Sequence, residues 1–489
     1  MSTPWTAGHL PGLAEDEVGW HTLSFGEGAR ALDVRVPVLT PEQLSALAQR
    51  VKDASAGHLK RLPVSHIVQI VDEAVARLLD PRDPYRQEAE RLLPVVSGYD
   101  AAMVRLGLTG FLQTFRAPQL HRFVAEDFAN PKVLDEFQPA VKGGFVRAFG
   151  PDLLVHSWAG NVPALPLWSL ACGLLVKAGS IGKLPSAEPV FASLFARLLA
   201  EVHPPLAECL AIVWWKGGDA ASAGALFAEA DTVLAYGGND AIAQVRAQVP
   251  VTARFLGYGH KLGFGLVSKA ALDTQRAPGI ARLAAHDIAR YEQQGCYSPH
   301  QFYVERGGKV DARAFAQYLA AELANLQHRH PRRALALEES ASVSGWRQGA
   351  ELRALAAEGH ELLGTEDSAW SVAFSEQPQP LAPTAGGRSI LVSAVDHLDD
   401  VVPLVAPHAR FLQTAGIAAE PQELFRLAEA LGRAGVTRIC ALGAMTAPEA
   451  GWHHDGRFNL ADLVRMVEIE QSAERAADRL APYAQEEKP

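Results

Sequence analysis

The sequence predicts an α/β protein built mainly from two domains, each with a parallel sheet. Short β-branched segments alternate with helical segments between residues 153 and 257, and a similar alternation returns between residues 263 and 440. Strands that alternate with helices indicate βαβ units, whose strands run parallel. Ligands of such sheets bind beyond the carboxyl ends of the strands, so we look for functional residues there.

Composition limits the class of protein. The chain has 489 residues, too many for one compact core, and 48% of them are hydrophobic, which is typical of a globular chain. A formal net charge of −10 argues against a nucleic-acid partner, whose binding face would be basic. It does not exclude an anionic cofactor, because local fields can oppose the global charge.

Targeting and cysteine signals are sparse. The N-terminus lacks the basic start and apolar run of a signal peptide, and the longest apolar run, residues 164–176, is shorter than the roughly 20 residues that span a bilayer. We therefore expect no membrane span and a cytoplasmic location. The 4 cysteines lie far apart without a CxxC pair, so we expect neither a disulfide framework nor a metal site.

The first half should begin with helices and continue as a parallel sheet. Residues 40–125 have helical periodicity, and Thr40 is a good N-cap for their first helix. Two strands joined at Gly150-Pro-Asp then indicate a hairpin over residues 143–158. The pattern predicts strands at 153–158, 180–184, 209–215, 232–236 and 252–257, with helices at 163–177, 188–202, 219–229 and 239–247.

The second half repeats the alternation. The pattern predicts strands near 263–268, 301–305, 389–394 and 410–414, helices near 278–292, 311–327 and 421–433, a loop at 375–388, and a last helix that begins at Asn459. We expect a helical N-terminal region with part of the first domain at 1–142, the hairpin at 143–158, the first α/β domain at 159–260, the second at 261–435, and a returning C-terminal segment with a helix at 436–489.

Cys296 is the candidate nucleophile. It stands in Gln294-Gly-Cys-Tyr-Ser-Pro, a polar loop between a predicted helix and strand, whereas Cys172 and Cys209 stand inside apolar runs and are expected in the core. Free cysteines are usually inert and buried, so the loop setting alone favours reactivity only in part.

Asn161 and Lys183 follow predicted strands of the first sheet. The Asn161 amide is placed to stabilise an oxyanion, but a helix N-cap is the commoner role of asparagine at such a turn. A lysine at the position of Lys183 reaches ribose or phosphate oxygens, although a solvated surface charge is the simpler interpretation.

Two further turns are notable. Gly237-Gly238 lies between a strand and a helix, where backbone N–H groups hold phosphates, and a tight βα turn has the same pattern. In Trp452-His453-His454-Asp455-Gly456 the neighbouring histidines are poor joint metal ligands, and either one could be a base or bind substrate. The alternative is a turn whose geometry Asp455-Gly456 sets.

Taken together, the order and spacing of these residues resemble the aldehyde dehydrogenase superfamily, and within it the LuxC-type acyl-CoA reductases. The segments that carry the resemblance are His156-Ser-Trp-Ala-Gly-Asn-Val-Pro, Gln294-Gly-Cys-Tyr-Ser-Pro, Arg438-Ile-Cys-Ala-Leu-Gly and Gly451-Trp-His-His-Asp-Gly-Arg. The resemblance covers residues 100–470 approximately. It implies an aldehyde-dehydrogenase-like fold with two Rossmann-like domains and a small oligomerisation hairpin, in a homodimer or homotetramer.

The resemblance also implies a reaction. Cys296 takes a fatty acyl group as a thioester, from acyl-CoA or from a partner acyl-protein synthetase, and NADPH reduces it to the aldehyde. Cys296 and Asn161 form the reaction centre. The residues implied to bind the dinucleotide are Trp158, Gly160, Lys183, Ser186, Gly237 and Gly238.

Two departures from hydrolytic aldehyde dehydrogenases refine the expectation. Leu256-Gly-Tyr-Gly-His-Lys has no glutamate where those enzymes activate water. Ser186 replaces a glutamate that would repel the 2′-phosphate of NADPH by about 1–4 kcal/mol, so NADPH is favoured and NADH is not excluded. Two alternatives stay open: a CoA-acylating aldehyde dehydrogenase that works oxidatively, and a non-catalytic scaffold for acyl transfer.

Overall fold

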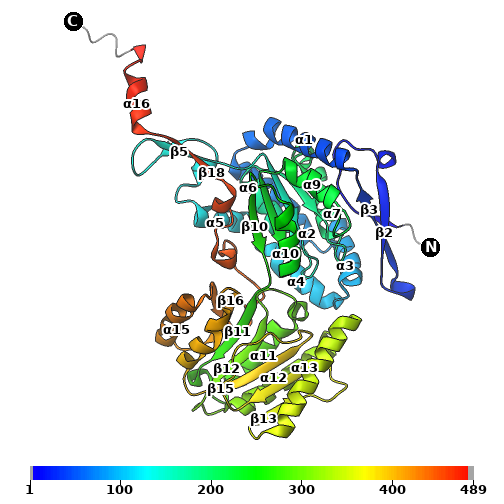
Figure 1. The fold of residues 1–489 in the computed structure, drawn as a ribbon, viewed down its shortest axis with the longest axis vertical. Coiled ribbons are helices and arrows are strands. Elements are labelled where there is room, and N and C mark those ends of the chain that lie inside the picture. The colour runs from blue at the N-terminus through cyan, green and yellow to red at the C-terminus, as the bar shows by residue number, and fades with distance from the viewer. Residues whose placement is uncertain (1–3, 483–489) are drawn as a thin grey trace.

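A computed structural model describes residues 4–482. Figure 1 shows two α/β lobes, with a smaller sheet and the C-terminal helix projecting from one of them. Among the described residues, no helix has the length and apolar character needed to cross a membrane.

The N-terminal region contains a small sheet, so the prediction of a helical region over 1–142 is wrong for residues 5–38. The strand order is β1-β3-β2, with β1 Trp5–Thr6, β2 Gly19–Phe25 and β3 Leu32–Val38. The expected helices follow as α1 Pro41–Gly57, α2 Val64–Leu79, α3 Pro84–Ser97, α4 Ala101–Gln113 and α5 Ala117–Asp127. The predicted N-cap is confirmed, because Thr40 Oγ1 accepts from Gln43 N at 3.2 Å.

The first large sheet confirms the predicted alternation. Its five parallel strands have the order β10-β9-β6-β7-β8. They are β6 Leu153–Ser157, β7 Gly179–Lys183, β8 Leu210–Val213, β9 Thr232–Tyr236 and β10 Arg254–Tyr258, joined by α6 Pro166–Leu175, α7 Phe191–Val202, α8 Pro204–Ala207, α9 Ala220–Glu229 and α10 Asn239–Gln248. The chain leaves the central strand β6 toward β7 and later returns to its other side as β9, which creates a switch point suited to a ligand.

The second large sheet has seven strands in the order β13-β14-β15-β12-β11-β16-β17, all parallel except β13. They are β11 Leu262–Val267, β12 Pro299–Glu305, β13 His360–Leu363, β14 Ser371–Ser375, β15 Ser389–Val395, β16 Leu412–Ala418 and β17 Arg438–Ala441. The helices are α11 Ala277–Ala289, α12 Ala312–Arg329, α13 Leu337–Ala356, α14 Val401–Val405 and α15 Pro421–Ala434. The predicted elements are present, and β13, β14, β17, α13 and α14 are additional.

The hairpin predicted over 143–158 does not form. Strand β5 (Phe145–Phe149) pairs with β4 (Gln138–Pro139) and with β18 (Arg465–Ile469), while β6 belongs to the first large sheet. The last helix predicted from Asn459 is also wrong, because residues 465–469 form β18 and the helix α16 spans Gln471–Asp478. Pairing with β5, a strand distant in sequence, overrides the helical prediction for residues 465–469.

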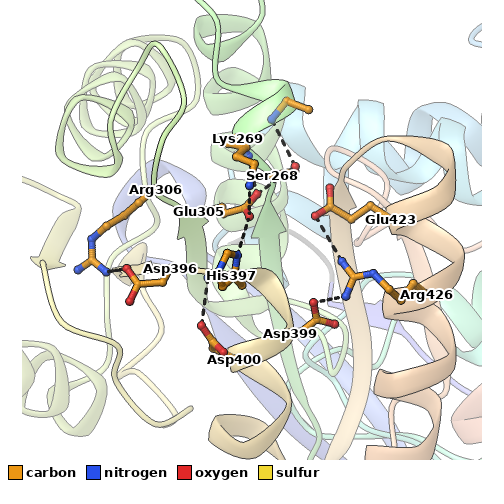
Figure 2. A network of polar contacts seen from close by, with 11 residues as sticks. Ser268, Lys269, Glu305, Arg306, Asp396, His397, Asp399, Asp400, Glu423 and Arg426 are labelled. Carbon is orange, nitrogen blue, oxygen red and sulfur yellow. Dashed lines mark hydrogen bonds and ion pairs between the residues drawn. The ribbon is translucent and has the colours of Figure 1, made fainter.

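Ion pairs close the carboxyl edge of the second sheet. Figure 2 shows Glu305, at the end of β12, accepting from Ser268 and Lys269, and Arg306 paired with Asp396. Arg426 pairs with Asp399 beside them. The Glu305 carboxylate is buried and already bonded, so it has little capacity for a ligand. The polar residues that face a cavity lie instead at the opposite, amino edge of this sheet.

Candidate active site

A cavity of about 470 Å³ joins the carboxyl edge of the first sheet to the amino edge of the second. Its wall is formed by residues of α4, of the turns after β6, β9 and β10, of the loop before β12, and of the C-terminal segment. The lining residues are Phe111, Ala159, Asn161, Val162, Leu165, Trp168, Tyr236, Gly237, Gly238, Tyr258, Gly259, His260, Lys261, Gln293, Gln294, Gly295, Cys296, Tyr297, His300, Pro448, Trp452 and His454. Aromatic and aliphatic side chains dominate one part of the wall, and none of these residues is an aspartate or glutamate.

The loop that carries Cys296 is strained and firmly held. Three consecutive residues after α11, Tyr291, Glu292 and Gln293, have left-handed φ values of 52°, 51° and 61°, which cost on the order of 1–3 kcal/mol each. The Gln293 amide donates to the carbonyls of Pro299 and Ser389, at 2.9 and 3.0 Å. These bonds fix the loop against two strands, so Cys296 is presented at the cavity wall.

The protonation of Cys296 does not distinguish it from the other cysteines. Burial raises the pKa of its thiol to about 11, with a further contribution from the Asp455 carboxylate. Burial also raises the thiol pKa of Cys209 and Cys440 to about 11. Cys172 and Cys209 are buried in the core as predicted. Cys296 differs because it lines the cavity, and because Gln413 Nε2 donates a hydrogen bond to its sulfur at 3.4 Å.

Asn161 lies on the same cavity wall and does not cap a helix. Helix α6 begins only at Pro166, with Leu165 as its N-cap, so the N-cap alternative is wrong. Asn161 Nδ2 donates to the Gln294 carbonyl at 2.6 Å, and the Asn161 carbonyl accepts from the Tyr99 hydroxyl at 2.7 Å. An amide nitrogen carries two hydrogens, so one remains for a substrate oxygen. The asparagine therefore links the first sheet to the loop of the cysteine.

The turn after β9 suits a phosphate. Gly237 and Gly238 line the cavity, and Gly238 is the N-cap of α10 without any side-chain cap. The first-turn N–H groups of this helix are therefore available to an anion. A Cβ at Gly238 would meet no atom within 4 Å, so there is space in front of the turn. These observations fit a dinucleotide bound at the switch point of the first sheet.

Four residues predicted to bind the dinucleotide lie outside the cavity wall. Lys183 ends β7 as predicted, and burial lowers the pKa of its ammonium, which has no carboxylate partner among residues 4–482. Ser186 is exposed, and its hydroxyl accepts from Trp214 Nε1 at 3.1 Å. A Cβ at Gly160 would approach the Ala187 Cβ to 2.9 Å, so the backbone there is closely packed.

Trp158 does not offer its side chain to a ligand. Its indole is 3% exposed and donates to Ser169 Oγ at 2.9 Å. The ring fills the space above Gly182, where a Cβ would lie 1.8 Å from it. The prediction that Trp158 binds the cofactor is therefore restricted to its backbone, because its side chain is used in packing.

The histidine pair separates into two environments. His454 lines the cavity and stacks on Tyr258, with ring centroids 4.5 Å apart, and burial lowers its pKa to about 4. The ring of His453 packs edge-on against Phe458 instead. Asp455 and Gly456 both have positive φ, 56° and 74°, as the turn interpretation expects.

Three polar residues near the sulfur were not predicted. Gln413 Nε2 also donates to Asp455 Oδ1 at 2.6 Å, and Lys261 Nζ lies 3.7 Å from Asp455 Oδ2. They come from β16, the C-terminal segment and the linker between β10 and β11. A glutamine and a threonine inside a short predicted strand, Leu412-Gln-Thr, were the available signal, because buried polar side chains need partners.

One family of known proteins matches most of the chain. The family model described as acyl-CoA reductase (LuxC) matches residues 59–466. A long-chain acyl-protein thioester reductase of Photorhabdus laumondii is 27% identical over 428 residues, covering 86% of this chain and 85% of that protein. A protein of the same name from Vibrio harveyi is 26% identical over 423 residues, covering 85% and 84%.

Solved structures show the same fold. The aldehyde dehydrogenase KauB of Pseudomonas aeruginosa has a TM-score of 0.73 at 15% identity, covering 96% of this chain and 97% of that one. Aldehyde dehydrogenase 21 of Physcomitrella patens has a TM-score of 0.71 at 14% identity, covering 96% and 98%. The predicted aldehyde-dehydrogenase-like fold with parallel-sheet α/β domains is thus confirmed.

Proposed function

This chain belongs to the acyl-CoA reductase (LuxC) family, and we propose from that premise that it reduces a fatty acyl thioester to the aldehyde, with Cys296 as acyl carrier and NADPH as reductant. One observation carries the proposal. Cys296, Asn161 and the Gly237-Gly238 turn line a single cavity whose remaining wall is largely apolar. A fatty acyl chain bound in such a cavity would lie next to a nucleophile, an oxyanion donor and a phosphate-binding turn.

The acyl-transfer step uses the residues of the nucleophile loop. The Cys296 sulfur attacks the thioester carbonyl, the bond from that carbon to the donor sulfur breaks, and the thiol proton passes to the departing thiolate. The Asn161 amide and the Cys296 backbone N–H stabilise the oxyanion that forms. The cavity wall has no carboxylate to activate water, which supports an acyl-enzyme that persists until it is reduced.

The cofactor fits the carboxyl edge of the first sheet. Gly238 and the start of α10 would hold the pyrophosphate, and Lys183 would reach the ribose. A bound reduced nicotinamide supplies the hydride. NADPH is favoured because Ser186 carries no charge, and because Glu188, two residues on, is buried and accepts from the N–H groups of Val190 and Phe191. Burial raises the pKa of Glu188 to about 7, which further reduces repulsion of a 2′-phosphate.

The acyl group would occupy the apolar part of the cavity, beside Phe111, Leu165, Trp168 and Trp452. Burial of each CH₂ group there contributes about 0.8 kcal/mol, which favours a fatty chain over a short polar one. The family description names acyl-CoA and the relatives are named long-chain acyl-protein thioester reductases, so the proposed donor is either acyl-CoA or a protein thioester. A partner synthetase would supply the protein thioester.

A homodimer or homotetramer remains part of the proposal. Figure 1 shows β5, β18 and α16 projecting from the first lobe. Met466, Val467 and Ile469 on β18 are exposed apolar residues, which supports an interface on the sheet β18-β5-β4. Light scattering after size exclusion tests this: Val467→Lys should lower the mass to that of a monomer, and a monomeric wild type would contradict it.

The function is tested with acyl-CoA of increasing chain length. Oxidation of NADPH should accompany formation of aldehyde, and a mass-tagged acyl group should appear on Cys296. Cys296→Ser should lose turnover, whereas the control Cys440→Ser, at a half-buried position outside the cavity wall, should retain it. Unchanged turnover in Cys296→Ser would remove the mechanism. Stoichiometric binding without acylation would favour a scaffold, and net oxidation of aldehyde with NADP⁺ and CoA would favour the oxidative dehydrogenase.

A further inference from the structure

The sulfur of Cys296 is in contact with a fully buried amide. Gln413, the second residue of β16, is 0% exposed, and its Nε2 lies 3.4 Å from the sulfur. The second hydrogen of this nitrogen is directed to Asp455 Oδ1 at 2.6 Å. Its Oε1 accepts from Thr414 Oγ1 at 3.3 Å. Both ends of the amide are therefore bonded, as a buried polar group requires.

Asp455 determines which end of the amide faces the sulfur. An ionised carboxylate accepts hydrogen bonds and cannot donate them, so the NH₂ group must lie next to it. The reverse orientation would place the Gln413 carbonyl oxygen against both the carboxylate and an anionic sulfur. Asp455 is itself fixed, because its side chain is 7% exposed and lies 3.7 Å from Lys261 Nζ.

We propose that Gln413 is a catalytic residue that donates a hydrogen bond to the Cys296 sulfur while it carries negative charge, and that Asp455 is the positioning residue that orients this donor. The proposal rests on the function proposed above. Charge develops on the sulfur twice. It appears before the sulfur–carbon bond forms, when the thiol releases its proton to solvent water, from which the donor thiolate recovers one after it leaves, and again when that bond breaks and its electron pair returns to sulfur with release of the aldehyde.

The surroundings explain why such a donor is needed. Burial and the Asp455 carboxylate both raise the pKa of Cys296, whereas the Gln413 hydrogen bond and the Lys261 ammonium lower it. The other titratable groups of the wall are His260, His300, His454, Tyr236, Tyr258 and Tyr297. Burial lowers the pKa of all three histidines and raises that of the tyrosines, so these groups are neutral near pH 7.

Alkylation of Cys296 by iodoacetamide tests the donor without acyl substrate or cofactor. The rate is followed by peptide mass spectrometry from pH 6 to 10. Gln413→Met keeps the length of the side chain but removes the donor, and it should slow alkylation at pH 8 by about 10-fold or more, because hydrogen bonds to charged groups are strong. Gln413→Asn, whose shorter amide loses the contact, should also slow it, and it serves if the methionine variant fails to fold.

The matched control is Gln301→Met. Gln301 is a fully buried glutamine on β12 of the same sheet, and its amide donates to the Gln379 carbonyl and to Ser393 Oγ. Its alkylation profile should match that of the wild type. The proposal is overturned if folded Gln413 variants alkylate at the wild-type rate, or if Gln301→Met slows alkylation equally.

A double-mutant cycle tests the role of Asp455. In the Gln413→Met background, Asp455→Asn only removes a repelling charge and should speed alkylation. In the wild-type background, Asp455→Asn also allows the Gln413 amide to turn its oxygen toward the sulfur. The increase in the alkylation rate should therefore be at least about 3-fold smaller there. Equal effects in both backgrounds would overturn the positioning role. If wild-type Cys296 were never acylated by acyl-CoA, the function would fail while these profiles could still be measured.

Discussion

Glu292 and Arg388 form a two-pronged ion pair behind the nucleophile loop, with both N–O distances at 2.9 Å and the two side chains 5% and 1% exposed. Arg388 also donates to the Gln327 side chain and to the His330 carbonyl. Both partners have left-handed backbones, with φ of 51° and 67°. The pair therefore holds two strained segments together, four residues before Cys296 and at the start of β15.

Loss of this pair should destabilise the protein strongly. Arg388→Ala leaves the Glu292 carboxylate buried without its partner, a change that typically costs about 3–5 kcal/mol. Urea unfolding measures the free energy of unfolding, and acylation of Cys296 should fall in parallel because the loop loses its support. The control Arg433→Ala breaks an exposed pair with Glu429 and should change stability by less than about 0.5 kcal/mol. Equal losses in the two variants would contradict this role of the pair.

Removal of the Asn161 amide should reduce turnover more than binding. Asn161→Ala loses an oxyanion donor, so we expect kcat to fall by about 100- to 1,000-fold with a smaller change in KM. Because Asn161 also bonds the Gln294 carbonyl, alkylation of Cys296 serves as the control for loop position. A variant that loses turnover and alkylation together would indicate a structural role of Asn161 instead.

A charge at residue 186 should change the preferred cofactor. Ser186→Glu places a carboxylate where it would repel a 2′-phosphate, by about 1–4 kcal/mol. The ratio of kcat/KM for NADPH to that for NADH should therefore fall by roughly 5-fold or more. Ala220→Glu, which adds the same single negative charge at an exposed position after β8, is the control. An unchanged ratio in Ser186→Glu would mean that the ribose lies elsewhere.

The sequence predicts the two large sheets well because their signal is local. Strands β6, β8 and β9 are short, mainly apolar and almost wholly buried, and the helices α6, α7 and α9 between the strands bury apolar residues of their own. Helix α13 was missed because only Ala350 on it is buried, so it has little apolar periodicity. Strand β18 was assigned to a helix because its pairing with β5 brings together residues far apart in the chain.

The sequence singles out four residues that line the cavity but not the contacts between the side chains there. Asn161, Gly237 and Gly238 stand out at turns that follow strands, and Cys296 stands out in the polar loop before β12; all four line the cavity. Gln413 acquires its role only because β16 lies beside the nucleophile loop and the C-terminal segment folds back over it. The packing of the Trp158 ring is not evident from the sequence either, because it depends on the room that Gly182 leaves on the neighbouring strand.

Stability should fall below neutral pH, in part because His156 is buried. This histidine is 0% exposed, and burial lowers its pKa to about 3 from an ordinary value of 6.5. Below pH 6.5 this histidine therefore binds a proton in the unfolded chain but stays neutral in the folded chain. The stability that the neutral ring contributes is complete above pH 6.5 and is lost as the pH falls toward 3. Between pH 7 and pH 5 the loss amounts to about 2 kcal/mol. The decrease in the free energy of unfolding from pH 7 to pH 5 should be smaller in His156→Leu than in the wild type by about 2 kcal/mol. Urea unfolding at both pH values measures it. The control His121→Leu, at an exposed position, should behave as the wild type does, and a His156 variant with the wild-type pH dependence would show that this ring is protonated in the folded protein.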